Sequence, residues 1–393
     1  MHVTRISSPA EFDRLETAWS ELAGENPFRG WDWNFTWWRH YGQGAELFVL
    51  VVRDDEQAVI GIAPWFLRWS PVNGGVLRFL GSGEICSEYH TLLCAQGRED
   101  DVAAAVAHWL TDATCSLPEW VYGEDEHHWQ LIDFSGIEAS NVAVNALLRH
   151  LGQLGNQVYQ RKAPSLWRLP LPATWEAYQA ILSKSHRKQV RQLENRVLQT
   201  DRAKLHTAND RESFLRGLEV LIDLHQRRRI QLGEAGCFAS PRFTAFHKEI
   251  AARLLHVGRL RLHWLELDGA PAAAEYHFSA GKVVYAYQAG VNPDLLEEEP
   301  GRLIGAATLK LAIEEGFGNF DFLRGDEPYK AHWRAEPRAC VDCRVIPRYA
   351  AARLRHGAYL VGRRMKHLLS ASLPRPLGVT ATNENWTPFV TIE

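Results

Sequence analysis

The chain has 393 residues, of which 46% are hydrophobic and 23% are charged, a balance typical of a soluble globular protein. This length exceeds what one compact core holds and indicates two domains of ordinary size. The formal net charge is −3, which is too small to create a field that attracts nucleic acid or an acidic membrane. We therefore expect no nucleic-acid partner, and membrane contact that is peripheral at most.

The N-terminal residues 1–19 lack the apolar segment of a secretory signal, and no stretch of the sequence reaches the length of a membrane-spanning helix. The sequence thus predicts a cytoplasmic protein. Its six cysteines are scattered, so we expect reduced thiols rather than a disulfide framework. Cys340 and Cys343 form a single C-x-x-C pair without a second pair at zinc-site spacing, which favours structural thiols, and no bound metal is expected.

Hydrophobic periodicity predicts most of the secondary structure. Apolar residues recur at helical spacing in residues 11–22, 31–42, 102–110, 142–154, 175–182, 214–225, 243–257 and 302–314. Short apolar or alternating runs predict strands at residues 47–52, 59–67, 76–80, 89–94, 129–134, 259–268, 272–278, 283–288 and 320–323.

The order of these elements indicates an internal duplication. Hairpin, third strand, helix and strand follow one another in residues 47–134 and again in residues 259–323. The sequence therefore predicts an α/β fold of two tandem units, each a mixed, mostly antiparallel sheet flanked by helices. We place the units at residues 1–164 and 165–348. Residues 349–393 form a basic amphipathic helix and a loose tail, which either covers the core or docks on a membrane or partner.

Residues 283–323 read as a strand, a helix and a second strand, and the start of such a helix is a natural anion site. Small residues in the first turn let a phosphate approach the backbone N–H groups. The turn has the pattern R-x-x-G-x-A, and its candidate cofactor-binding residues are Arg302, Leu303, Gly305, Ala306 and Ala307. Close packing of the helix on the sheet explains the same small residues. The glutamates at 297–299 would repel a phosphate unless they turn to solvent.

This R-x-x-G-x-A spacing resembles the pyrophosphate loop of the GNAT acyltransferases. The following segment, Arg324-Gly325-Asp326-x-x-Tyr329-Lys330-x-x-Trp333, resembles a signature of the CelD-like branch of that superfamily. Those bacterial proteins are linked to cellulose and exopolysaccharide production and are distantly related to the FemAB peptidyltransferases. The resemblance covers nearly the whole chain, because the aromatic helix at residues 31–42 and the basic segment at 183–196 also match.

The resemblance implies transfer of an acyl group from acyl-CoA, with acetyl-CoA as the donor, to an amine or hydroxyl of a polysaccharide or cell-envelope precursor. The corresponding helix of the first unit opens with residues 97–101, of which Glu99, Asp100 and Asp101 are acids, so only the second unit should bind acyl-CoA. Two alternatives stay open. One is a FemAB-like transferase that uses aminoacyl-tRNA; the other is a non-catalytic factor that docks in a polysaccharide synthase complex. The acceptor is expected to be a small molecule or a glycan.

Acyl transfer needs a base, an acid and a group that stabilises negative charge. Glu275 and His277 face the same side of a predicted strand, and either is a candidate base. Tyr329 is placed to protonate the leaving thiolate. Lys330 would neutralise negative charge or hold an anionic acceptor, and Asp326 would orient Lys330 or cap a helix.

Basic residues supply the candidate substrate-binding groups. Residues 183–196 are strongly basic, and within them Arg187 and Arg191 are candidates to hold a phosphate, a sugar phosphate or CoA. Arg324 of the signature is a third candidate. A solvated helix face is the simpler explanation of the same charges. His225 ends an apolar helical stripe and is interpreted as a packed core residue.

Overall fold

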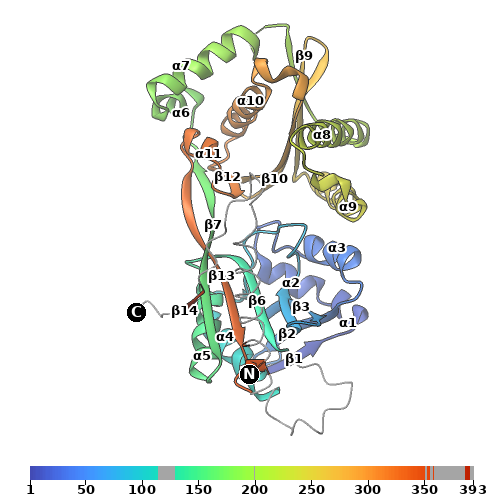
Figure 1. Cartoon of the computed structure of the whole chain (residues 1–393), viewed down its shortest axis with the longest axis vertical. Helices are drawn as coiled ribbons and strands as arrows, with labels where there is room; N and C mark the ends of the chain where they lie inside the picture. The colour runs from blue at the N-terminus through green and yellow to red at the C-terminus, as the bar shows by residue number, and fades with distance from the viewer. Residues whose placement is uncertain (114–128, 199, 350–351, 355–356, 358–385, 390–393) are drawn as a thin grey trace, which may run out of the picture. The chain divides into compact units, whose positions relative to one another are not determined.

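The computed structural model describes residues 1–113, 129–198, 200–349, 352–354, 357 and 386–389 (Figure 1). The α-helices are α1 (Pro9–Asp13), α2 (Glu16–Ala23), α3 (Trp31–Tyr41), α4 (Glu99–Ala113), α5 (Val142–Gln153), α6 (Trp175–Ile181), α7 (Lys184–Leu193), α8 (Arg211–Gln231), α9 (Pro241–His256), α10 (Pro300–Glu314) and α11 (Pro328–His332). Other helical turns are η2 (Glu194–Leu198), η3 (Cys237–Ala239) and η4 (Pro293–Glu298). The strands are β1 (His2–Ile6), β2 (Glu46–Arg53), β3 (Val59–Ser70), β4 (Gly74–Phe79), β5 (Leu93–Cys94), β6 (Leu131–Glu138), β7 (Gln157–Pro170), β8 (Ala203–Thr207), β9 (Leu260–Leu267), β10 (Ala270–Ala280), β11 (Val283–Val291), β12 (Asn319–Arg324), β13 (Glu336–Ile346) and β14 (Thr387–Pro388).

The chain divides into two compact units, which we describe separately. Unit 1 comprises residues 1–24, 28–163 and 339–393, and unit 2 comprises residues 25–27 and 164–338. The sequence places residues 339–348 in the second unit, whereas the structure places them in unit 1. The reason is strand pairing, because this part of β13 is antiparallel to β6, with Cys340 opposite Glu138.

In unit 2 the strand order is β7-β12-β11-β10-β9-β8. Strands β8 to β11 are antiparallel neighbours, β11 and β12 are parallel, and β12 is antiparallel to β7. Helix α10 makes the crossover between the two parallel strands, as such a connection requires. The predicted strand-helix-strand arrangement is therefore present.

In unit 1 the strand order is β1-β2-β3-β4-β6-β13, with β5 paired to β3. Strands β1 to β4 are antiparallel, and β4 and β6 are parallel, with α4 in the crossover between them. The two units thus repeat one order of strands and one crossover helix. The predicted fold class, a mixed α/β fold built from two such units, is confirmed.

Helices cover both faces of the unit 2 sheet. Successive residues of a strand point to opposite faces. Glu275 of β10 accepts a hydrogen bond from Thr308 of α10, whereas its neighbour Tyr276 has its hydroxyl 3.4 Å from Nδ1 of His247 in α9. Helix α10 therefore lies on one face of the sheet and α9 on the other. Helix α8 lies on the same face as α9, with its backbone directly against β11 at Gly290.

Strand β11 contains a bulge in its pairing with β10. Tyr276 lies opposite Gln288 and His277 opposite Ala286, so Tyr287 is the extra residue. Because of this extra residue, Tyr287 and Gln288 both face the α8 and α9 side. The Tyr287 hydroxyl lies 3.1 Å from Nε2 of His247, and the Gln288 amide contacts Cys237.

Some expectations differ from the structure. Within the predicted strand at 89–94 only Leu93–Cys94 is a strand, because Cys86 and Tyr89 have positive φ angles of 48° and 59° that turn the chain before it. Strands β1, β7, β8 and β13 are absent from the predicted set. The basic amphipathic helix expected in residues 349–393 lies largely outside the described residues.

The contact between Gly290 and α8 generates a stability prediction. A Cβ atom at residue 290 would lie 2.6 Å from the backbone nitrogen of His225, so Gly290→Ala must push α8 from the sheet. We expect the free energy of unfolding to fall by about 1–3 kcal/mol, as for other overpacked positions, measured by urea denaturation. The control is Gly318→Ala, whose added Cβ meets Lys282 at an ordinary 3.8 Å. Equal stability of the two variants would contradict the packing described here.

Candidate functional site

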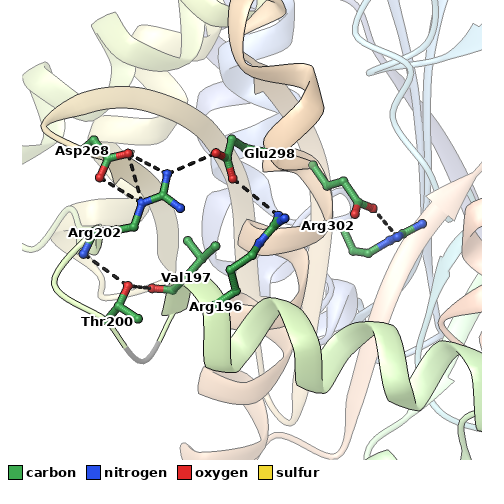
Figure 2. A network of polar contacts seen from close by, with 8 residues as sticks. Arg196, Val197, Thr200, Arg202, Asp268, Glu298 and Arg302 are labelled. Atoms are coloured by element: carbon green, nitrogen blue, oxygen red, sulfur yellow. Dashed lines mark hydrogen bonds and ion pairs between the residues drawn. The ribbon is translucent and has the colours of Figure 1, made fainter.

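Acidic and basic side chains gather around the start of α10, as Figure 2 shows. Glu298 forms ion pairs with Arg196 at 3.5 Å and with Arg202 at 3.1 Å. Arg202 also pairs with Asp268 at 2.7 Å. The acidic run that precedes the helix is thus neutralised in part by arginines from η2 and from the turn before β8, and it does not simply point to solvent.

The predicted anion-binding turn is engaged by groups of the chain itself. Glu299 precedes the helix with a φ of 54°, and its carbonyl oxygen accepts hydrogen bonds from the N–H groups of Arg302 and Leu303. Pro300 has no N–H to offer. The Glu299 carboxylate pairs with the Arg302 guanidinium, and both side chains are exposed, by 43% and 33%. Such an exposed ion pair contributes about 0–1 kcal/mol to stability. A doubly charged anion can therefore displace the Glu299 carboxylate and bind the Arg302 guanidinium in its place.

The other predicted cofactor-binding residues lead from the helix start toward the sheet. Leu303 and Ala306 are buried, and Gly305 and Ala307 are half-buried. A Cβ atom at Gly305 would lie 3.5 Å from the Trp333 ring and 3.8 Å from Oε1 of Glu275. Gly305 therefore brings the helix backbone close to a carboxylate that the sequence identified as a candidate base.

Glu275 and His277 are brought together as period-two alternation predicts. Nε2 of His277 lies 3.2 Å from Oε2 of Glu275, and the same oxygen accepts a hydrogen bond of 2.7 Å from the Thr308 hydroxyl. His277 is 3% exposed and Glu275 is 14% exposed. Oε2 thus accepts a hydrogen bond from Thr308 and contacts the His277 ring, whereas Oε1 faces the side of Gly305. Of the two candidate bases, Glu275 is the more exposed.

A second histidine extends this group across the sheet. His263 of β9 lies opposite Glu275 in the strand pairing, and its ring is 6.2 Å from that of His277. Nδ1 of His263 is 2.9 Å from the Thr207 hydroxyl. Burial lowers the pKa of His263 to about 3, so this histidine stays neutral and adds no positive charge beside His277.

Tyr329 lies near the same carboxylate. Burial, then the negative charges of Glu327 and Glu275, raise the pKa of the Tyr329 phenol well above its ordinary value. The residue as a whole is 49% exposed, and its ring makes an edge contact with Phe322 at a centroid distance of 6.1 Å. The phenol therefore keeps its proton at neutral pH and can donate it.

Lys330 occupies a different environment from the one its predicted role requires. Its ammonium group is 2% exposed and donates to the carbonyl oxygens of Leu323, Arg324 and Gly325 at 3.0–3.3 Å. It also pairs with Glu327 at 2.9 Å. Four oxygens therefore use its three N–H groups, and Lys330 holds the turn after β12 instead of facing an acceptor. The backbone of Arg324, a candidate substrate residue, is part of the same turn.

Asp326 is not the partner of Lys330, and the prediction that it orients this lysine is wrong. Its Oδ1 accepts hydrogen bonds from the backbone N–H of Ser165 at 3.2 Å and from the indole of Trp167 at 3.1 Å. Nor does it cap α11, since the capping position is Glu327 and no side chain bonds there. Asp326 instead ties the turn to β7, a contact between residues about 160 positions apart.

The two candidate substrate-binding residues of α7 donate hydrogen bonds to groups at the end of α6. Arg187 donates through Nη2 to the carbonyl oxygens of Ala180 and Leu182 at 2.8 and 3.1 Å, which satisfies groups left open at a helix C-terminus. Arg191 donates through Nε to the side chain of Gln179 at 3.2 Å. Arg191 is otherwise exposed and keeps its outer N–H groups toward solvent, whereas Arg187 is committed to the fold.

Sequence reasoning missed residues that complete the site. Thr308 stands three positions after Gly305, so helical spacing alone could have placed both toward the sheet. His186 packs on Trp333 with ring centroids 5.0 Å apart, and its Nδ1 lies 2.8 Å from the His332 carbonyl oxygen. This contact joins the start of α7 to the end of α11, and no local sequence pattern predicts it.

The parallel pair next to this site is short. Strands β11 and β12 pair only from Val283 to Tyr285, opposite residues 319–321. Beyond these positions β12 turns away, with Leu323 at a φ of 56°. The rest of β11 consequently presents backbone N–H and C=O groups on the β12 side that no described strand pairs, and an extended ligand can use such an edge.

Within the described residues, no three His, Cys, Asp or Glu side chains are grouped so that they could hold a metal ion. Among the helices described, none combines the length and the apolar character needed to cross a bilayer. Cys340 and Cys343 are buried on β13.

The environment of Lys330 predicts a loss of stability on substitution. Lys330→Met keeps the apolar stem but leaves three buried carbonyl oxygens without their donor. We expect the free energy of unfolding to fall by about 1.5–3 kcal/mol in chemical denaturation. Lys310→Met is the matched control, because Lys310 is 40% exposed with only Glu314 at 4.0 Å, and it should change stability by about 0.5 kcal/mol or less. A Lys330→Met protein as stable as its control would contradict this role.

Comparisons with known structures agree with this architecture. The structure of FemX has a TM-score of 0.57 and 12% sequence identity, over 87% of this chain and 97% of that one. A conserved protein of unknown function from Bacteroides thetaiotaomicron VPI-5482 has a TM-score of 0.54 and 9% identity, over 88% and 100%. The C-terminal domain of a putative lysylphosphatidylglycerol synthetase from Agrobacterium fabrum has a TM-score of 0.51 and 12% identity, over 90% and 97%. Identities this low show a shared fold.

Sequence comparison is more specific for unit 2. No match to the chain was found among curated proteins. A family model described as an acetyltransferase (GNAT) domain matches residues 184–331, the segment that contains Glu275, the start of α10 and Tyr329. The CelD-like branch has no counterpart among these matches and stays a prediction. Residues 184–331 of this chain thus match the model of a GNAT acetyltransferase domain, and the chain shares its fold with FemX.

Proposed function

We propose that unit 2 transfers an acyl group from acyl-CoA, with acetyl-CoA as the usual donor, to an amine or hydroxyl of a polysaccharide or cell-envelope precursor. The reaction would take place in the cytoplasm, and a polysaccharide synthase complex is the proposed setting. The observation that carries the proposal is the Glu275 carboxylate, held by His277 and Thr308 inside the segment that matches the GNAT domain.

Glu275 serves as the base in this scheme. Its Oε2 accepts a hydrogen bond from Thr308 and lies 3.2 Å from His277, which leaves Oε1 to take a proton from the attacking amine or hydroxyl. His277 is too buried to meet an acceptor directly, so it positions the carboxylate. The nucleophile then attacks the acyl carbonyl carbon and forms a tetrahedral intermediate, which collapses with loss of the CoA thiolate.

Tyr329 serves as the acid. Its raised pKa keeps the phenol protonated at neutral pH. The phenol proton goes to the leaving sulfur, so the thiolate departs as CoA–SH. A base for the nucleophile and an acid for the leaving group are what such a transfer requires.

The start of α10 serves as the seat of the diphosphate. When the diphosphate replaces Glu299 as the partner of Arg302, it contacts a guanidinium group and the positive end of the dipole of a 15-residue helix. The free edge of β11 then lies along the path from this turn toward Glu275, where the extended pantetheine arm would bind.

A FemAB-like reaction with aminoacyl-tRNA is the second candidate. The likeness to FemX extends over 87% of this chain, and α7 presents the exposed basic side chains Lys184, Lys188 and Arg191. Both donors carry an activated acyl group, so the base and the acid would act in the same way. The two reactions differ in what binds at α7 and at α10, and the donor therefore has to be tested directly.

The donor test uses the purified chain with acetyl-CoA and, separately, with a mixture of aminoacyl-tRNAs. We expect calorimetry to show binding of acetyl-CoA and no binding of the tRNA mixture at physiological salt. Binding of tRNA alone, with incorporation of an amino acid into a cell-envelope precursor, would favour the FemAB-like reaction. Binding of neither donor would favour the accessory factor that lacks catalysis.

Glu275→Gln tests the proposed base. The amide keeps the shape of the side chain but cannot accept a proton, so release of CoA thiol in the presence of amino-sugar and glycan acceptors should fall about 100-fold or more. The matched control is Glu266→Gln, which alters a second carboxylate–histidine pair, with His206 at 3.0 Å, at the far edge of the sheet. Retained turnover in Glu275→Gln would remove Glu275 from the mechanism.

Glu299→Gln tests the seat of the diphosphate. Removing this carboxylate frees Arg302 and takes a negative charge away from the helix start, so the Kd for acetyl-CoA should fall about fivefold, equivalent to ~1 kcal/mol. Glu297→Gln removes the same charge from a neighbouring exposed position and serves as the control. An identical change in both variants would point to net charge alone, and no change in either would place the diphosphate elsewhere.

A further inference from the structure

A second cluster of reactive side chains lies on the other face of the unit 2 sheet, the face covered by α8 and α9. Sγ of Cys237 is 3.6 Å from Nε2 of His225, and Nδ1 of His225 is 3.0 Å from Oε1 of Gln226. Gln288 of β11 donates from its amide nitrogen to the same sulfur at 3.3 Å. The sulfur thus lies between an imidazole and an amide donor.

Neighbouring groups fix the orientation of both amides. The Gln226 amide nitrogen donates to the Ala235 carbonyl oxygen at 2.9 Å, which leaves its oxygen for His225. The Gln288 oxygen accepts from the Ala289 N–H at 3.0 Å, which leaves its nitrogen for the sulfur. Nδ1 of His225 must therefore carry the proton, and Nε2 faces the thiol as a free acceptor.

The resting pair is neutral. Burial raises the pKa of Cys237 to about 11 and lowers the pKa of His225, so a thiol faces an uncharged imidazole. The charged groups beside the pair are Arg229 and Glu234, which bond one another at 2.7 Å. A neutral thiol is activated when a neighbouring base removes its proton during the attack, as in enzymes whose nucleophile is a hydroxyl group.

Glycine is required at the position before the cysteine. Gly236 has a φ of 74°, and a Cβ atom there would lie 2.2 Å from Oε1 of Gln226. The close approach of Gln226 to His225 therefore depends on this glycine. Cys237 itself is half-buried.

We propose that Cys237 is a nucleophilic thiol that takes an acyl group from a thioester, with His225 as its base, Gln226 as the positioning residue for His225 and Gln288 as the donor that stabilises the sulfur. The Sγ atom attacks the thioester carbonyl carbon while its proton passes to Nε2 of His225. A new C–S bond to Cys237 forms, the old C–S bond breaks, and the proton moves from His225 to the departing thiolate. One thioester is thus exchanged for another, with no change of oxidation state.

An acyl group suits this cluster better than an oxidant. Cys237 is the only cysteine in residues 164–338, so unit 2 offers no second thiol to resolve a sulfenic acid as a disulfide. The neutral thiol also lacks the thiolate character that peroxide requires. A base that removes the proton during attack is useful for a carbonyl electrophile. The inference shares with the proposed function only the chemical class of the donor.

The experiment uses S-acetyl-N-acetylcysteamine, a thioester without a diphosphate, so that its outcome does not depend on binding of CoA at α10. The full chain is incubated with the probe, digested and analysed by mass spectrometry. We expect Cys237 to gain one hydroxylamine-labile acetyl group at least tenfold faster than Cys86, an exposed cysteine of unit 1. Cys237→Ser should abolish that label.

Two further variants test the base and the donor. His225→Gln should slow acetylation of Cys237 at least tenfold and should move its pH-rate profile toward that of an unassisted thiol, which reacts only as the thiolate forms. Gln288→Leu leaves α8 intact and should slow the reaction by about threefold or more. Acetylation of Cys237 at the rate of Cys86, or a rate and pH profile unchanged in both variants, would overturn the proposal.

Discussion

The short parallel pairing between β11 and β12 is the constraint on which the site in unit 2 depends. The strands share positions 283–285 and 319–321, after which β12 leaves the sheet at Leu323. A parallel pair requires a crossover, and here the crossover is α10, whose Thr308 reaches Glu275 on β10. The divergence also creates the turn that Lys330 fills with its ammonium group. Glu275, the start of α10 and Tyr329 are therefore positioned by a single departure from regular pairing.

The sequence predicts those parts of the site that depend on residues close together in the chain, and it fails for the parts that depend on distant residues. Glu275 and His277 were placed together because alternation along a strand is a local rule. The α10 crossover was placed by glycines and helical spacing, which are local as well. Lys330 and Asp326 could not be resolved in this way, because their partners are backbone groups of a folded turn and residues of β7 about 160 positions away. A charged signature residue can look catalytic in sequence and prove to be the support of a turn.

Strand pairing and the charge balance at the start of α10 also depend on residues that are distant in the chain. Strand β7 contains Pro164 and several polar residues, so its pattern is weak, and its pairing is decided by partners distant in sequence. The glutamates at 297–299 predict repulsion of a phosphate when only their own segment is considered. In the fold, Arg196 and Arg202 reach Glu298 from another part of the chain and Arg302 reaches Glu299, so the helix start is nearly balanced in charge. An exposed balanced cluster opposes an incoming anion weakly, because each pair is worth about 1 kcal/mol or less.

The bulge at Tyr287 links the two faces of the sheet. Without an extra residue, Gln288 would lie opposite Glu275 and share the α10 face, since a shift of one position moves a side chain to the other side. With the bulge, Gln288 lies opposite Tyr276 and reaches Cys237 under α8, and the α10 face next to Glu275 receives the small Ala286 and Ala289 instead. The irregularity therefore affects both faces at once: it keeps an amide away from the Glu275 carboxylate, and it brings that amide to the Cys237 thiol. A regular β11 could supply one of these environments but not both.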